Sequence, residues 1–355
     1  MSDADERSRP SDLTSVLARL DPLADASAQL HEILRLGLDN LPLPGCGETL
    51  RRWQALATVA AHNLSLAKLY EGHTDAQAIL AELDEPAEPA KSNMRVATAN
   101  GKAWGVWAAE AASARVTITP LYGNAVLLDG TKCWCSGAQT LSHGLLTAWH
   151  ADGQGPQLVR VAMRQPGVSV SAAAWQAVGM AGSASVDVSF LQADAHVVGE
   201  VGDYLSRPGF WQGGAGIAAC WYGGAMGLGV ALHETLAESL PAARGAFRLA
   251  ALGKVDLALH STAAVLREAA QWIDDHPLGD ASMVALRARL AAEACAKTVL
   301  DEAGRALGAS AFCRNARFAR AAADLPVFVR QSHAERDFAA LAERVILLGG
   351  TPWQL

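Results

Sequence analysis

The chain has 355 residues, of which 51% are hydrophobic and 18% charged, with a formal net charge of −7. This length predicts more than one structural unit, and the acidic balance disfavours a nucleic-acid partner. The polar start, Met1 to Pro10, is unlike a signal peptide, and no apolar run reaches the length of a membrane span, so we expect a cytoplasmic protein without membrane association.

Helical periodicity dominates the chain up to residue 83. The segment Pro42–Gly47 interrupts the pattern, and a longer helix is predicted from Glu48 to Leu83, with Gly72 as a further interruption. Pro86 and Pro89 mark a linker. We therefore predict an N-terminal helical domain over residues 1–94.

The hydrophobic period changes to two near Arg95. Strands are predicted at 116–118, 126–128, 145–149, 158–163, 168–170 and 186–190. Turn residues such as Gly123, Gly153 and Gly167 separate them. Short strands at this spacing predict a small barrel or sandwich, over residues 95–207.

One predicted strand, residues 128–138, carries an unusual set of side chains. Strand alternation puts Lys132, Trp134 and Ser136 on one face, and Cys133 and Cys135 on the other as small hydrophobes. A Trp beside a hydroxyl forms a flat apolar wall with a hydrogen-bonding group, which suits a planar heteroaromatic cofactor. A Trp in the core of a sandwich explains the same pattern.

Helical periodicity returns after Pro208 and continues to the end. Helices are predicted at 213–228, 253–274, 282–307 and 325–348. Their Ala and Gly content predicts close helix packing in a four-helix bundle, over residues 208–355. The Gly-rich stretch 213–229 lies in this helical pattern and not after a strand, so we interpret it as helix packing rather than as a nucleotide loop. The six cysteines are too scattered for a disulfide framework or a zinc site, and no metal is expected.

The pattern Leu128-x-Gly130-x-Lys132-x-Trp134-x-Ser136-Gly137-Ala138 resembles the flavin-contacting strand of the acyl-CoA dehydrogenase family. The order of helical domain, β domain and helical bundle is also the order of that family. The resemblance implies an α+β multi-domain protein with the acyl-CoA dehydrogenase fold, and FAD between barrel and bundle. It further implies a homodimer or homotetramer, in which a second subunit completes the site.

The same resemblance implies roles for individual residues. In the family the Trp packs beside the isoalloxazine ring and the hydroxyl reaches its N5 edge. The implied cofactor contacts are Trp107, Ala109, Glu110, Trp134, Cys135, Ser136, Arg244 and Gly308. In the family the Arg holds the pyrophosphate of the neighbouring subunit's FAD, although Arg244 fits a solvated surface side chain equally well.

Two histidines are candidate catalytic residues. The register through Gly308 and Asp324 places the family's C-terminal glutamate base at Ser332, whose hydroxyl is not a base near neutral pH. His333 lies beside that position, and a histidine side chain can act as an acid or a base there; it also fits an exposed member of a charged helix. His73 falls where the family lines the substrate side, or it caps a helix C-terminus.

The predicted activity is FAD-dependent α,β-dehydrogenation of an acyl thioester or a related small-molecule acyl substrate; a CoA or carrier thioester is one option, and the sequence does not show whether CoA is used. Two alternatives remain open: a monooxygenase of the same fold that uses reduced flavin, and a catalytically silent relative that binds flavin or a partner. The chain lacks the family's glutamate and its Gly-Ala-Gly-Ser-Asp loop, and these two absences keep both alternatives to the dehydrogenase open.

Overall fold

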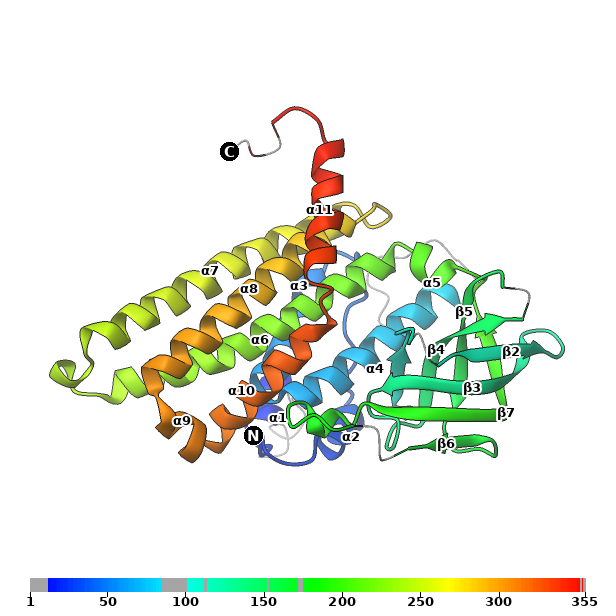
Figure 1. Cartoon of the computed structure of the whole chain (residues 1–355), viewed down its shortest axis with the longest axis horizontal. Helices are drawn as coiled ribbons and strands as arrows, with labels where there is room; N and C mark the ends of the chain where they lie inside the picture. Colours follow the sequence, from blue (N-terminus) through cyan, green and yellow to red (C-terminus); the bar gives the residue numbers. More distant parts are fainter. Residues whose placement is uncertain are drawn as a thin grey trace, which may run out of the picture.

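The computed structural model describes residues 12–84, 101–111, 114–151, 153–171, 175–351 and 353 (Figure 1). Helices occupy both ends of the chain, and the strands lie between them. In Figure 1 the strands form a barrel at the right, and the long helices α6, α7 and α8 extend to the left. The predicted linker at Pro86 and Pro89, and the predicted change of period near Arg95, lie outside the described residues.

The N-terminal helices are α1 (Leu13–Leu17), α2 (Ala26–Arg35), α3 (Thr49–His62) and α4 (Leu64–Leu83). Three of the four, α1, α2 and α4, begin at side-chain caps, whereas the N-cap residue of α3 makes no such hydrogen bond. The predicted helix from 48 to 83 is interrupted at Asn63 and not at Gly72. Asn63 is extended, and its side chain accepts a hydrogen bond from the Leu66 N–H at 2.8 Å, which starts a new helix. Gly72 lies inside α4, where it faces the backbone of Val106.

The strands close into a barrel. They are β1 (Trp104–Trp107), β2 (Val116–Pro120), β3 (Ala125–Cys135), β4 (His143–His150), β5 (Pro156–Ala162), β6 (Val168–Val170) and β7 (Val186–Val198). The ladder runs β4-β2-β3-β7-β5, and β5 pairs again with β4, which completes the ring; β1 joins β4, and β6 joins β7. Each strand predicted from alternation is present; β3 merges the predicted strands 126–128 and 128–138 and ends at Cys135, and β7 extends further than predicted.

A bulge in β3 changes the predicted faces around Trp134. Lys132 pairs with Val188 and Cys135 with Val186, so Cys133 and Trp134 of β3 lie opposite the single residue Asp187 of β7. Trp134 has a positive φ of 59°. The bulge puts Lys132 and Cys135 inside, at 3% and 0% exposure, and leaves Trp134 at 55%. The prediction that Lys132 shares a face with Trp134, opposite Cys135, was therefore wrong.

The C-terminal helices form the bundle. They are α5 (Asp203–Ser206), α6 (Gly209–Glu238), α7 (Ala246–Asp275), α8 (Ser282–Leu307), α9 (Ala309–Arg314), α10 (Ala316–Phe328) and α11 (Glu335–Leu347). The 3₁₀ turns η2 (Pro241–Ala243) and η3 (Val329–Gln331) lie between these helices, whereas η1 (Ala181–Ser183) precedes β7. The Gly-rich stretch lies inside α6, as predicted. A Cβ at Gly223 would overlap the backbone of Ala57 on α3, so this glycine permits close packing of the two helices.

The predicted last helix, 325–348, is broken between α10 and α11. Ser332 is extended and Ala334 has a positive φ of 48°. Arg289 on α8 holds this break, because its guanidinium donates to the Gln331 carbonyl at 2.9 Å and to the Gly214 carbonyl at 3.0 Å. A contact from another helix, invisible to local periodicity, thus ends α10.

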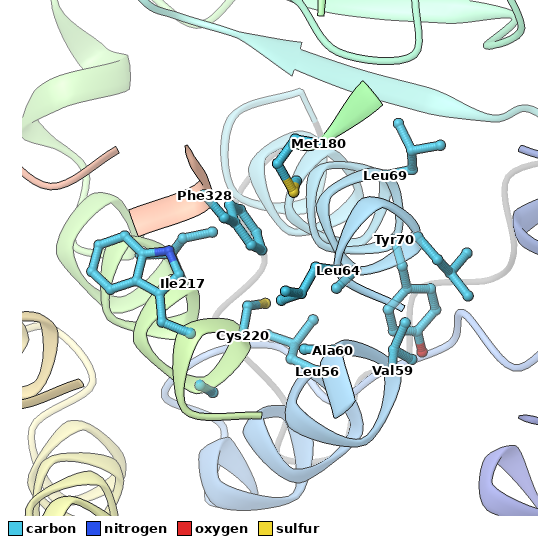
Figure 2. Close-up of a cluster of buried hydrophobic side chains, with 14 of the residues drawn as sticks. Leu56, Val59, Ala60, Leu64, Leu69, Tyr70, Met180, Ile217, Cys220 and Phe328 are labelled. Atoms are coloured by element: carbon cyan, nitrogen blue, oxygen red, sulfur yellow. The ribbon is translucent and has the colours of Figure 1, made fainter. Parts of the chain in front are cut away.

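A hydrophobic core connects the barrel with the helices that precede it in the sequence and with those that follow it. Figure 2 shows Met180, from the turn before β7, and Phe328, from α10, directed toward Leu64 on α4 and Cys220 on α6. The architecture, a small barrel with a C-terminal helical region, is consistent with the acyl-CoA dehydrogenase-like fold that the resemblance implied.

Substitution of Gly144 by Ala is expected to destabilise the barrel. A Cβ on Gly144 would overlap the ring of Trp107, which is 2% exposed and has no room to turn. Overpacking of this kind costs about 1–3 kcal/mol of unfolding free energy, measurable by urea denaturation. Gly214→Ala is the matched control, because nothing lies within 4 Å of its Cβ position in α6. Equal stability of the two variants would contradict the packing argument.

Candidate functional site

Trp134 is an exposed aromatic side chain held in a strained conformation. Its φ of 59° is rare for a bulky residue, and 55% of the residue is accessible. Strained backbone of this kind persists only where the surrounding structure imposes it, and it concentrates at functional sites. The bulge therefore presents a flat aromatic surface to the outside of the barrel.

Ser136 begins a row of hydroxyl groups next to this surface. Its Oγ lies 2.7 Å from the Oγ of Ser185, which lies 3.2 Å from the Oγ of Ser183. The Ser183 hydroxyl donates to the Met180 carbonyl at 2.8 Å. The row therefore runs from the Trp134 bulge to the turn that precedes β7.

Asp324 on α10 anchors that turn. Its Oδ1 accepts the Met180 N–H at 2.5 Å, and its Oδ2 has no hydrogen-bond partner among the described residues. Met180 and Ala184 both have positive φ, 59° and 40°. Burial raises the pKa of the Asp324 carboxyl. The Met180 N–H and the nearby Arg320 lower this pKa, but by less than burial raises it.

Trp107 supports the site from inside. It is 2% exposed, and its Nε1 donates to the Ser136 carbonyl at 3.1 Å. It therefore positions the Ser136 backbone and offers no face to a ligand. Strand β1 ends at Trp107, and Ala109 lies in the exposed segment that follows.

Glu110 and Lys132 form an ion pair at the barrel. Lys132 is 3% exposed, and its Nζ lies 2.6 Å from Glu110 Oε1 and 2.8 Å from Thr147 Oγ1. Burial alone would raise the pKa of Glu110, but hydrogen bonds from Lys132, Thr147 and Trp149 hold it below its usual range. The carboxylate that the resemblance placed beside the cofactor is thus occupied by protein partners.

A narrow cleft separates Ser136 from α4. It has a volume of about 10 Å³ and is lined by Lys68, Leu69, Gly72, residues 104–107, Ser136 and Leu141. Lys68 Nζ lies 2.9 Å from Glu71 Oε2, and both side chains are about 15% exposed. The sequence analysis missed this pair, because a Lys and a Glu three residues apart on a helix usually mark a solvated surface.

A larger cavity of about 90 Å³ lies elsewhere, between the α3–α4 junction, α6 and α10. Asp324, which holds the turn before β7, also lines this cavity. Arg317 and Arg320 line it, but neither Trp134 nor Ser136 does. Its volume suits a few water molecules better than a ring system.

His73 is buried and uses both ring nitrogens. Its Nδ1 accepts the Trp104 N–H at 3.1 Å, and its Nε2 lies 2.9 Å from Asp39 Oδ2. At 1% exposure it links α4 to β1. It lies within α4 and not at its C-terminus, so the helix-cap alternative was wrong, and neither nitrogen is available to a substrate.

His333 lies in the break between α10 and α11. Its side chain is 63% exposed, and Nδ1 lies 3.4 Å from Asp337 Oδ1. The neighbouring Ser332 hydroxyl approaches Glu293 of α8, a carboxylate that the sequence analysis missed. Glu293 is 3% exposed and pairs with Lys297 at 2.6 Å. Burial opposes its ionisation, but Lys297 and Ser332 keep its pKa below the usual range.

The other implied cofactor contacts lie apart from Trp134 or are buried. Arg244, between α6 and α7, and Gly308, after α8, lie at the end of the bundle away from the barrel (Figure 1). Within one chain they do not reach Trp134. Cys135 is fully buried, and burial raises its thiol pKa far above the usual range, so its side chain fills the core.

Among the residues that the structure describes, no group of three or more His, Cys, Asp or Glu side chains is arranged to hold a metal ion.

Comparison with known proteins supports the fold. No protein-family model and no curated protein matches the sequence. Among solved structures, the chain is similar to TdsC from Paenibacillus sp. A11-2, a dibenzothiophene monooxygenase solved with FMN and indole, at 19% identity and a TM-score of 0.79. The match covers 96% of this chain and 97% of TdsC.

Two further structures extend this similarity. KijD3, solved with FMN and a dTDP-linked amino keto sugar, matches with 19% identity and a TM-score of 0.79, over 96% of this chain and 93% of its own. Methanesulfinate monooxygenase MsuC from Pseudomonas fluorescens matches with 17% identity and a TM-score of 0.75, over 96% and 97%. At these identities the similarity establishes the shared fold.

Removing the charge of Asp324 is expected to change how stability depends on pH. Its folded pKa is raised, so the folded state binds more protons than the unfolded state above about pH 4. The wild type should therefore lose stability as the pH rises through the folded pKa. Asp324→Asn, which still accepts the Met180 N–H, should lack this loss. Urea denaturation of both proteins between pH 4 and 8 measures the difference, and parallel pH profiles would refute the assignment.

Proposed function

We propose that this protein is a flavin-dependent oxidoreductase, and specifically a monooxygenase that uses reduced FMN. The observation that carries the proposal is the exposed Trp134 wall with the Ser136 hydroxyl two residues along, on the fold shared with FMN-bound TdsC and KijD3. FMN replaces the FAD expected from the sequence, because the similar structures TdsC and KijD3 were solved with FMN.

The residues around the bulge fit a flavin ring. Trp134 offers an aromatic face, Ser136 offers a hydroxyl that either donates or accepts, and Trp107 fixes the Ser136 backbone from below. Lys68, across the cleft, supplies a positive charge near the same hydroxyl. The cleft itself is too small for the ring, so the flavin would lie on the open side of Trp134.

The chemistry supplied by a bound reduced flavin is the transfer of two electrons to O₂, with one oxygen atom entering the substrate and the other leaving as water. The protein's part is to hold the ring against Trp134, to position Ser136 at its edge and to limit water in the cleft beside α4. Lys68 and Glu71 form the titratable pair at that cleft, and they would hold or orient a polar substrate group.

Acyl dehydrogenation has less support. It needs a base that removes an α-proton, and Ser332 occupies the position of the family's glutamate. The carboxylate beside it, Glu293, is buried and paired with Lys297. His333 points into an exposed turn with Asp337. Glu293 therefore lacks the accessible lone pair that proton abstraction requires, and His333, although exposed, lines neither the Ser136 cleft nor the larger cavity.

The proposal is tested by binding and then by reduction. We expect the purified protein to bind FMN in an absorbance or fluorescence titration, and to bind FAD more weakly. Butyryl-, octanoyl- or palmitoyl-CoA should leave the bound flavin oxidised under anaerobic conditions, whereas reduced FMN with O₂ should oxygenate aromatic or sulfur-containing test compounds. Anaerobic bleaching by an acyl-CoA would establish the dehydrogenase instead, and absence of flavin binding would favour the silent relative.

Trp134→Ala should weaken FMN binding at least tenfold, because the aromatic face of the site is lost. A tenfold change corresponds to about 1.4 kcal/mol, within what an aromatic contact and its buried area contribute. Trp353→Ala is the matched control, since Trp353 is 79% exposed in the C-terminal segment and far from the bulge. Equal FMN affinity in a folded Trp134→Ala variant would remove the basis of the proposed site.

We also propose that the protein is a homodimer or homotetramer that associates through α7. This helix contains an 18-residue apolar window, yet only 22% of that window is buried within one chain. Its uncovered small and apolar side chains recur at helical spacing, at Ala246, Ala250, Gly253, Leu257 and Ala264. Small residues let two helices approach closely, so a second copy of α7 fits this stripe. Association would also bring Arg244 of one subunit near another subunit.

Leu257→Glu should dissociate the oligomer, because it buries a charge at the centre of the stripe. Light scattering at micromolar concentration measures the change in mass. Leu278→Glu is the control, since Leu278 is 85% exposed in the turn after α7 and outside the stripe. A monomeric wild type, or an oligomer unaffected by Leu257→Glu, would contradict association through α7.

A further inference from the structure

The serine row behind Trp134 has hydrogen bonds that can run in two directions. Ser183 donates its only hydroxyl proton to the Met180 carbonyl at 2.8 Å, so toward Ser185 it can only accept. Ser185 and Ser136 lie 2.7 Å apart, and either can donate to the other. If Ser185 donates to Ser136, the Ser136 proton is free to point outward. If Ser136 donates to Ser185, and Ser185 to Ser183, then Ser136 presents a lone pair instead.

The backbone around this row is held in a costly conformation. Trp134, Met180 and Ala184 all have positive φ, a backbone conformation that residues other than glycine rarely adopt. The Gly137 N–H donates to the Ser183 carbonyl at 2.8 Å and ties the bulge to the turn. The result is a fixed acceptor at one end, the Met180 carbonyl, and a reversible group at the other, Ser136.

We propose that the row Ser136–Ser185–Ser183 is a hydrogen-bond switch that follows the oxidation state of a flavin on Trp134. The inference rests on the proposed function. A flavin's N5 accepts a hydrogen bond when the ring is oxidised and donates one when it is reduced. When Ser185 donates to Ser136, the Ser136 proton is free to bond to N5 of the oxidised ring. When Ser136 donates to Ser185, the Ser136 lone pair is free to accept from N5–H of the reduced ring. Only the hydroxyls of Ser136 and Ser185 rotate, and no proton enters or leaves the row.

Ser185 is the positioning residue in this arrangement. With the ring reduced, Ser136 accepts from the ring and needs an acceptor for its own proton, which Ser185 supplies. Without Ser185 that proton lacks this partner in a partly buried site, and such a loss destabilises the state that needs it. Removal of the Ser185 hydroxyl therefore disfavours the reduced flavin more than the oxidised flavin.

The test is the midpoint potential of FMN bound to the full-length protein, measured by equilibration with a reference dye. Ser185→Ala should lower the equilibrium for reduction about tenfold, which is roughly 30 mV for a two-electron couple. Ser185→Thr keeps the hydroxyl and should retain the wild-type potential. Ser183→Ala removes the acceptor at the far end and should shift the potential in the same direction. In a Ser136→Ala background, Ser185→Ala should have no further effect.

An unchanged potential in Ser185→Ala with FMN bound would overturn the switch and leave the flavin site intact. An equal shift in Ser185→Thr would overturn it too, because loss of packing would then explain the effect. Should Ser185→Ala fail to fold, Ser183→Ala decides the matter by the same criterion. Failure of the wild type to bind FMN would instead overturn the proposed function, and the switch with it.

Discussion

The hydrogen bond from the Met180 N–H to Asp324 is the constraint on which the rest of the site depends. It joins the turn before β7 to α10 at 2.5 Å, and so joins the barrel to the bundle. Gly179 lies so close to the Ala323 carbonyl that any Cβ would overlap it. The turn is therefore pressed against α10, Met180 fills the core beside α4 (Figure 2), and Ser183 and Ser185 are carried to the bulge. The energetic cost is a buried carboxyl, one oxygen of which has no hydrogen-bond partner in the described part of the chain.

The strands and most helices could be predicted because their burial follows a regular period. The failures have a common cause, which is a contact made by a distant segment. The face of Trp134 depends on how β3 pairs with Val186 and Val188, and a one-residue bulge reverses every side chain that follows it. The end of α10 depends on Arg289, which reaches the Gln331 carbonyl from another helix. Neither contact leaves a local signal in hydrophobic periodicity.

The candidate site was predictable only in part, for the same reason. The side chains of segment 128–138 predicted a cofactor contact, and Trp134 and Ser136 do lie together at an accessible position. Their supporting residues come from elsewhere in the chain: Trp107 from β1, Ser185 from the turn before β7, and Lys68 from α4. The resemblance implied a cofactor contact for Glu110 from its position in the sequence, but its carboxylate forms an ion pair with the buried Lys132. An isolated buried lysine would be expensive, so this pairing determines what Glu110 does.

The serine at position 332 has a physical explanation in its surroundings. Glu293 lies next to it at 3% exposure, with its charge compensated by Lys297 and by the Ser332 hydroxyl. A glutamate at 332 would place a second negative charge against this buried carboxylate, and one of the two would have to take up a proton. Arg289 further ties the segment to the Gln331 carbonyl and to the ring of Trp221. The segment that the resemblance aligns with the family's catalytic base is here a clamped junction between helices. We therefore propose that the chemistry of this chain takes place at the Trp134 bulge and the Lys68 cleft and not at the C-terminal loop.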